Sequence, residues 1–404
     1  MVLVKGLIDS SRVFERNMNI TNVDLSNIPF SYNSMTYAFI SCSNLQNVTN
    51  INENVTNMSY TFAYCYNLSE TPIIPNSVVN MTYSFENCRN LVNAPDLSNC
   101  TNLTNMSGTF HGCEKLSETP VIPNSVVNMN ETFYGCSNIP NIPDLSICVN
   151  LRDLRGTFMG CSKIRYATNL VNCVNLRGMN ETFWNCYNLV NAPEIPNSVV
   201  NMRATFYNCS NMVTVPVLPE NVIDISGLFM MCTNISLSPE IPNSVEEITQ
   251  TFLGCSKLIN VPDLYNCSNI TNMYGTFSEC DLITYPSVIP NNVDNLALTF
   301  SHCYNLVSAP DMSDCSNITN MYGTFYNCYK IGGDIIINSE NISNALNIFA
   351  YSSVYESQVP DRNVYIPFYN NGNNTTTYDS FINAGYSSTQ KGLHKVLLKD
   401  ITTL

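Results

Sequence analysis

Cysteine is the residue whose type and spacing first suggest chemistry in this sequence, because thiols bind metals, form disulfides and act as nucleophiles. The chain has 18 cysteines among 404 residues. Thirteen of them follow a phenylalanine by three residues, from Cys42 after Phe39 to Cys328 after Phe325. The other five each lie fifteen residues after a phenylalanine, at Cys100, Cys148, Cys173, Cys267 and Cys315. A repeat therefore fixes the position of every cysteine.

This arrangement argues against most thiol chemistry. Zinc requires a tetrahedral cluster of ligands such as paired C-x-x-C motifs, and the sequence has none. A row of thirteen cysteines at one repeat position could form disulfides between neighbouring repeats, but the pairing would be arbitrary and would leave one thiol over. Free cysteine is a small and commonly buried apolar residue. We expect buried, reduced thiols and no metal or cofactor.

The histidines and aspartates give no catalytic set. The three histidines, His111, His302 and His394, lie at unrelated positions of the repeat. Four aspartates share one position of the longer repeats but never occupy adjacent ones, so they do not form the carboxylate pair of a glycosidase. We interpret them as solvated turn residues, with a weak Ca²⁺ site as the alternative, at Asp96, Asp144, Asp263 and Asp311. The sequence therefore predicts a protein that is not an enzyme.

The elements that position these residues are short repeats. Fourteen phenylalanines recur at intervals of 23 or 25 residues, with a final interval of 24, at Phe39, Phe62, Phe85, Phe110, Phe133, Phe158, Phe183, Phe206, Phe229, Phe252, Phe277, Phe300, Phe325 and Phe349. Most have methionine or an aliphatic residue four positions earlier, and an apolar residue three positions after the cysteine. These offsets of four, three and three predict one face of a short helical turn, which the neighbouring repeats must cover.

The fold predicted from this repeat is an α/β solenoid. We expect a right-handed stack of about fourteen coils of the leucine-rich-repeat type, with a parallel β ladder and small terminal caps. The extended segment Leu189–Ile195 is an example of the predicted strand. The shorter repeat carries Ile-Pro-Asn-Ser-Val, as at 195–199, and the longer one carries Pro-Asp-Leu-x-x-Cys, as at 95–100.

The predicted domains are an N-terminal cap at residues 1–30, the solenoid at 31–350 and a small α/β cap at 351–404. In and near the C-terminal cap we expect strands at 332–337, 364–368 and 393–401, a polar loop at 370–377 and a helix at 378–386. The sequence has no run of about 18 apolar residues, so no membrane span is predicted. The N-terminus also lacks the apolar stretch of a signal peptide, which favours an intracellular, virion-associated or non-classically exported protein.

The net charge argues against polyanionic partners, and the residues at one repeat position favour a binding surface for another kind of partner. The net charge is −14, without a basic stripe, so nucleic acid and anionic membranes are not expected as partners. The residue after the phenylalanine is bulky in six successive repeats and mostly small or polar elsewhere, and an outward orientation would make it a binding stripe. The alternative is packing between coils. The stripe comprises Tyr134, Met159, Trp184, Tyr207, Met230 and Leu253.

The repeat resembles the BspA-like, or Treponema-type, leucine-rich repeat in its pattern Ile-Pro-x-Ser-Val-x-x-Met-x-x-Thr-Phe-x-x-Cys. The longer form resembles a related bacterial surface-protein repeat. The resemblance implies adhesion, binding of a host protein or glycan at a cell surface, or cell aggregation. The C-terminal Tyr-Ile-Pro-Phe segment at 365–368 resembles the ends of phage repeat proteins. We therefore expect a recognition protein, with a phage fibre or tail-associated protein as the alternative; homo-oligomerisation stays open.

Overall fold

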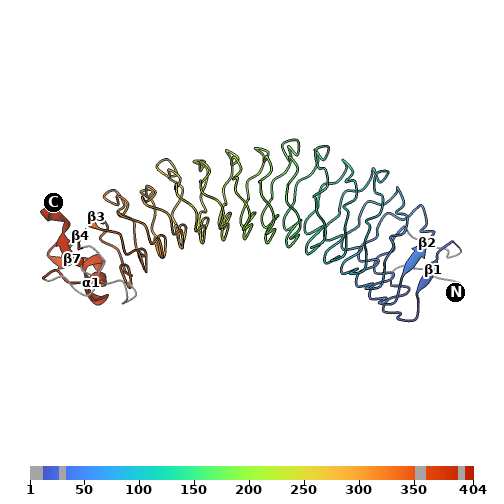
Figure 1. Ribbon diagram of the computed structural model, residues 1–404, viewed down its shortest axis with the longest axis horizontal. Coiled ribbons are helices and arrows are strands. Elements are labelled where there is room, and N and C mark those ends of the chain that lie inside the picture. The colour runs from blue at the N-terminus through green and yellow to red at the C-terminus, as the bar shows by residue number, and fades with distance from the viewer. Residues whose placement is uncertain (1–11, 27–32, 351–360, 390–395) are drawn as a thin grey trace. The chain divides into compact units, whose positions relative to one another are not determined.

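The computed structural model describes residues 12–26, 33–350, 361–389 and 396–404. The chain divides into two compact units, Met1–Asn201 and Met202–Leu404. Within each unit the chain winds through successive short coils (Figure 1). No helix in the described ranges has the length and apolar character that a membrane span requires. The repeat-type solenoid predicted from the sequence is therefore present.

The segment around each repeat phenylalanine is a chain of tight turns. In one coil the amide of Thr61 donates to the carbonyl of Met58 at 3.0 Å, and that of Cys65 donates to Phe62 at 3.1 Å. The third residue of each turn has positive φ, 54° at Tyr60 and 62° at Tyr64, as a type II turn requires. The predicted helical turn is therefore wrong, although its apolar residues do share the buried face.

Neighbouring coils are joined by hydrogen bonds from every second residue of this turn segment. Met58, Tyr60 and Phe62 each donate their amide to a carbonyl of the next coil at 2.8 Å. The parallel β ladder passes through the residue five before the phenylalanine, one residue for each coil. It links Asn57, Asn80, Asn105 and Asn128 in the first unit, and Asn272, Asn295, Asn320 and Asn344 in the second.

The strand predicted at Leu189–Ile195 is wrong. That segment contains a single isolated bridge, between Tyr166 and Asn191, and no strand. The hydrogen bonds that recur from coil to coil are made mainly by the turn segments instead. The prolines at positions 193 and 196 have no amide hydrogen, so they donate nothing to a ladder at this place.

The core of each unit is a column of stacked phenylalanines. Ring centroids of successive repeats are 5.0–5.7 Å apart in the first unit and 5.5–5.9 Å apart in the second. The repeat phenylalanines from Phe39 to Phe349 have no exposed surface. Stacked aromatic pairs add about 0.5–1.5 kcal/mol to the stabilisation from burial. A repeated phenylalanine therefore stabilises both its own coil and the contact with the next.

Threonine and cysteine satisfy the carbonyl groups around this column. Thr61 Oγ1 donates to the carbonyl of Met58 at 2.6 Å, and Cys65 Sγ donates to that of Phe39, in the preceding coil, at 3.1 Å. The same two contacts recur along the chain, as at Thr132 and Cys136. All eighteen cysteines are buried and none is in a disulfide, which confirms the predicted burial. Burial raises the pKa of Cys232 to about 12.

The predicted N-terminal cap is described only over residues 12–26. There Phe14 stacks on Phe39 at 5.0 Å, and Arg12 and Arg16 have the positive φ of the turn segment. This part of the predicted cap therefore continues the repeat. Strand β1 (Asn22–Asp24) pairs in parallel with β2 (Asn47–Thr49).

The C-terminal end carries a three-stranded parallel sheet in the order β3 (Gly333–Ile336), β4 (Arg362–Ile366) and β7 (Val396–Asp400). The three predicted strands are thus confirmed, although β4 begins and ends two residues before the predicted 364–368 and residues 393–395 of the third prediction lie outside the described residues. Helix α1 (Thr376–Asn383) begins two residues before the predicted one, with Thr375 as its N-cap. The predicted polar loop contains most of the hairpin β5 (Tyr369–Asn370) and β6 (Asn373–Asn374). A 3₁₀ turn (Ile401–Thr403) follows β7.

A buried tyrosine attaches this end to the last coil. The amide of Phe349 donates to Tyr386 Oη at 3.1 Å, and Phe381 of α1 packs against the Tyr386 ring at 5.7 Å. Helix α1 is the single α-helix of the described residues. The α part of the predicted α/β solenoid is therefore confined to the C-terminal end, and turns form the coils themselves.

Candidate functional site

Four positions of each turn segment carry side chains that are exposed or half-buried in most coils, with exceptions such as Ala63 and Ser301, which are buried. These positions are the third and second residues before the phenylalanine and the first and second after it; we call their side chains the turn face. The predicted stripe occupies the first position after the phenylalanine, and its six members are all half-buried. Half-buried side chains in this position both pack between coils and remain accessible, so the stripe stays a prediction. Tyr134, Met159 and Trp184 lie in the first unit, and Tyr207, Met230 and Leu253 in the second.

A longer row of aromatic contacts lies on the turn face of the first unit. The rings of Tyr37 and Tyr60 stack at 5.0 Å, and those of Tyr60 and Tyr83 at 5.1 Å. The Arg12 guanidinium lies over the Tyr37 ring at 4.7 Å. These tyrosines are the second residue before the phenylalanine in three successive coils, a position outside the predicted stripe. Their spacing of 23 residues was the signal available to find them.

The row then steps to the neighbouring position of the turn face. The Tyr83 ring lies 6.0 Å from that of His111, and His111 stacks on Tyr134 at 4.3 Å and 4°. Gly108 makes this step possible, because a Cβ on it would lie 2.1 Å from Cε1 of Tyr83. We call the connected side chains the aromatic path: Arg12, Tyr37, Tyr60, Tyr83, His111 and Tyr134.

Two carboxylates fix tyrosines beside the path. Tyr83 Oη donates to Glu131 Oε2 at 2.8 Å, and Tyr64 Oη donates to Glu86 Oε1 at 2.6 Å. The hydrogen bond to Glu86, together with burial, raises the pKa of Tyr64 to about 12. Burial and then the bond to Glu131 also raise the pKa of Tyr83. Both phenols stay protonated at neutral pH and hold their carboxylates in one geometry.

The turn face of the first unit has carboxylates along the path and one arginine beyond it. From the Phe39 coil to the Phe133 coil, all within the described residues, Glu86 and Glu131 are its only formally charged side chains. In the next coil Arg155 Nε donates to Asn130 Oδ1 at 3.1 Å. The exposed arginines Arg152 and Arg177 lie on adjoining coils.

The aspartates behave as expected for turn residues. Asp96, Asp144, Asp263 and Asp311 are exposed, and each accepts the backbone amide two residues later at 2.9 Å. This hydrogen bond lowers the pKa of Asp96. Within the described ranges no three His, Cys, Asp or Glu side chains converge on a common point.

The remaining histidines do not join the path. His302 belongs to the second unit, where its Nδ1 lies 2.8 Å from Ser301 Oγ. Its ring contacts that of Tyr326 at 5.3 Å. His394 lies outside the described residues. Of the three histidines in the sequence, His111 is thus the one that the structure places among aromatic side chains of the first unit.

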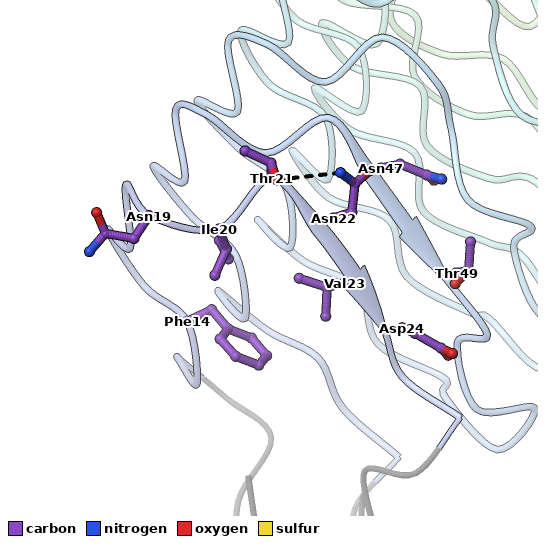
Figure 2. A pocket seen from close by; sticks show the side chains of 9 residues that line it. All are labelled: Phe14, Asn19, Ile20, Thr21, Asn22, Val23, Asp24, Asn47 and Thr49. Atoms are coloured by element: carbon purple, nitrogen blue, oxygen red, sulfur yellow. Dashed lines mark hydrogen bonds between the residues drawn. The ribbon is translucent and has the colours of Figure 1, made fainter. Parts of the chain in front are cut away.

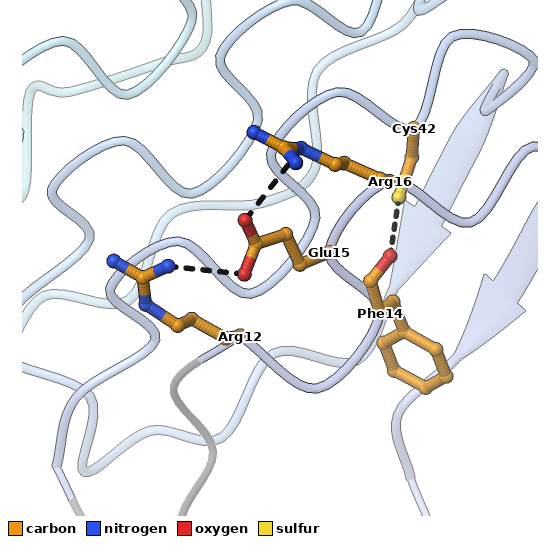
Figure 3. A network of polar contacts seen from close by, with 5 residues as sticks. All are labelled: Arg12, Phe14, Glu15, Arg16 and Cys42. Atoms are coloured by element: carbon orange, nitrogen blue, oxygen red, sulfur yellow. Dashed lines mark hydrogen bonds and ion pairs between the residues drawn. The ribbon is translucent and has the colours of Figure 1, made fainter.

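Two surface hollows have little that could perform chemistry. A hollow of about 370 Å³ lies beside β1; Phe14 and Ile20 are among its lining residues, and Asp24 is its titratable residue (Figure 2). Next to it, Glu15 contacts Arg12 and Arg16, while Cys42 donates to the Phe14 carbonyl (Figure 3). A hollow of about 540 Å³ in the second unit is lined by Ile259, Asn260, Val261, Thr284, Tyr285 and Pro286. Neither holds two titratable side chains, so neither offers an acid–base pair.

Comparison with known proteins agrees with the repeat architecture. Residues 179–307 match the BspA type leucine-rich repeat region in six copies. Residues 30–143, 79–196 and 119–218 match the Mycoplasma protein of unknown function, DUF285. No curated protein matches the sequence at a significant level.

One solved structure of a leucine-rich repeat protein is similar in fold, and two others match more weakly. A protein from Bacteroides ovatus is 21% identical, with 78% of this chain and 87% of that one covered and a TM-score of 0.53. A leucine-rich cell surface protein from Faecalibacterium prausnitzii is 14% identical, with coverages of 78% and 82% and a TM-score of 0.29. A T. pallidum leucine-rich repeat protein is 17% identical, with coverages of 60% and 72% and a TM-score of 0.23.

Proposed function

Because the chain carries BspA-type leucine-rich repeats, we propose that it is a non-enzymatic recognition protein. It binds a protein or a glycan at a cell surface through the turn face. The right-handed stack of about fourteen coils expected from the sequence is the scaffold for this surface. The observation that carries the proposal is the ordered row of aromatic side chains on the turn face, from Tyr37 to Tyr134.

The order of these side chains favours recognition over a purely structural role. The core is already closed by the phenylalanine column, and the tyrosines add a second aromatic row outside it. Tyrosine and tryptophan dominate binding hot spots because they bring large contact area with few torsions to freeze. The half-buried Trp184 and Tyr207 continue the same kind of surface within their own units.

An array of glycans and host-surface proteins tests the proposal. We compare the wild-type chain with the double variant Tyr60→Ala/Tyr134→Ala, whose tyrosines belong to this row, and expect a specific signal that the variant loses. The matched control is Tyr265→Ala/Tyr285→Ala, because these tyrosines are 74% and 68% exposed and lie outside the turn face. Thermal unfolding of each variant verifies that the coils remain folded. An absent signal from the wild type, or an equal loss in the control, would refute the proposal for the arrayed ligands.

A further inference from the structure

We infer that the aromatic path of the first unit binds a partner protein through a basic surface of that partner, which presents lysine or arginine side chains. The inference rests on the proposed recognition function and narrows it to one region and one class of partner. It follows from three features of the path: the orientation of its rings, the sign of its charges and the position of Arg12.

Ring orientation argues for a protein over a glycan. Sugars bind aromatic side chains by lying flat on a ring face. On the path both faces of Tyr60 are covered, by Tyr37 at 5.0 Å and by Tyr83 at 5.1 Å. One face of Tyr134 is likewise covered by His111. The path therefore offers ring edges and hydroxyl groups held in fixed positions, as the tyrosine-rich surfaces of protein binders do.

Charge determines which protein surface fits. The carboxylates Glu86 and Glu131 lie beside the path, and the turn face from the Phe39 coil to the Phe133 coil bears no lysine or arginine. Arg89, which follows Glu86 by three residues, lies outside the turn face, and its Nε lies 3.5 Å from Glu114 Oε1. A partner with exposed cations meets complementary charge here, and an acidic partner is repelled.

Arg12 provides an internal example of this recognition. Its guanidinium lies over the Tyr37 ring at 4.7 Å, and Nη1 contacts Glu15 Oε2 at 3.1 Å (Figure 3). A cation thus already covers the end of the tyrosine stack with a carboxylate as its second partner. Guanidinium groups favour this combination of ring face and carboxylate. At and beyond Tyr83, the carboxylates Glu86 and Glu131 lie beside the path, and the turn face there has no lysine or arginine as far as the Phe133 coil.

A random dodecapeptide library displayed on phage, selected against the full chain, tests the inference. We expect the enriched peptides to contain lysine or arginine beside apolar residues. Synthetic copies of them should bind roughly tenfold more weakly to the variant Glu86→Gln/Glu131→Gln. Glutamine keeps a carbonyl oxygen that accepts the Tyr64 and Tyr83 hydroxyls, so the path itself should stay folded. Glu70→Gln/Glu118→Gln removes the same charge at exposed positions outside the turn face and should leave the affinity unchanged.

The other outcomes separate this inference from the proposed function. Enrichment of acidic or uncharged peptides, or equal weakening by the control pair, would overturn the inference while the chain remains a recognition protein. Glycan binding that requires Tyr60 and Tyr83, with no peptide enriched, would overturn it in the same way. Failure of peptides, glycans and host proteins alike to bind would remove both proposals.

Discussion

The hydroxyl of Tyr83 donates a hydrogen bond of 2.8 Å to Glu131, a residue two coils further along the chain. The coil between them contributes Gly108 at the place where the Tyr83 ring crosses. The choice of glycine in one repeat is therefore tied to tyrosine in the repeat before it and to glutamate in the repeat after it. Contacts of this kind make the turn face of the first unit a connected surface.

Replacing Gly108 tests this connection. Gly108→Ala places a Cβ 2.1 Å from the Tyr83 ring at a residue with φ of +59°. We expect a loss of about 2–3 kcal/mol, from the left-handed conformation together with the displaced Tyr83 hydrogen bond. Urea unfolding measures it.

The control is Gly227→Ala, which has φ of +61° and meets only Ala204 Cβ at 3.9 Å. This variant carries the conformational cost alone, about 1–2 kcal/mol. Equal effects of the two substitutions would show that Tyr83 does not occupy the space above Gly108.

Threonine before the phenylalanine should be replaceable by serine but not by valine. Thr132 Oγ1 donates to Met129 at 2.6 Å and lies 2.9 Å from the Met106 carbonyl. Thr132→Val keeps the shape but removes the donor, so we expect a cost of about 1–3 kcal/mol. Thr132→Ser keeps the hydroxyl and should cost less, as measured by denaturant unfolding. A valine variant as stable as the serine variant would contradict this role.

The buried thiols should make the fold sensitive to alkali. Burial raises the pKa of Cys42 to about 11 and that of Cys148 and Cys232 to about 12, from an ordinary value of 9.0. A raised pKa stabilises the fold fully below pH 9, and this stabilisation is lost as pH rises through the folded values. Between pH 9 and its folded pKa, each such thiol lowers the free energy of unfolding by about 1.4 kcal/mol for every pH unit.

We therefore expect the unfolding temperature, measured by circular dichroism under reducing conditions, to fall steeply between pH 9 and 11. At pH 8 the thiols should react with a disulfide reagent only after unfolding. An unfolding temperature that is unchanged from pH 8 to pH 10.5 would contradict the account of the cysteine row.

The repeat and its buried residues were predictable because the same residue types recur at the same positions of so many repeats. Phenylalanine and cysteine at a fixed offset identify the core positions without any knowledge of backbone conformation. The turn conformation was harder, because offsets of four, three and three fit a helix as well. The distinguishing signal is glycine or asparagine at the positive-φ positions, as at Gly108, Gly112 and Asn87. The β ladder includes only one residue in each coil, so the sequence has no alternation of apolar and polar residues that would indicate a strand there.

The site was predictable only in part. The position after the phenylalanine could be followed along the chain, so the predicted stripe shares Tyr134 with the aromatic path. The tyrosines two residues before the phenylalanine share one repeat position and could have been found by their spacing of 23 residues. Their connection to His111 could not, because the path changes position between Tyr83 and His111. That change depends on contacts between coils that no single repeat position reveals. Phe14 was missed because residues near it lack the other repeat signals.

The most direct test of the central claim is hydroxyl-radical footprinting of the chain with and without the partner that the arrays identify. Tyrosines of the turn face, among them Tyr60, Tyr134 and Tyr207, are the predicted sites of protection. Tyr265 and Tyr285, which are exposed outside it, provide the internal reference and should react equally in both states. Protection of Tyr265 and Tyr285, with the turn-face tyrosines unchanged, would show that recognition uses another surface.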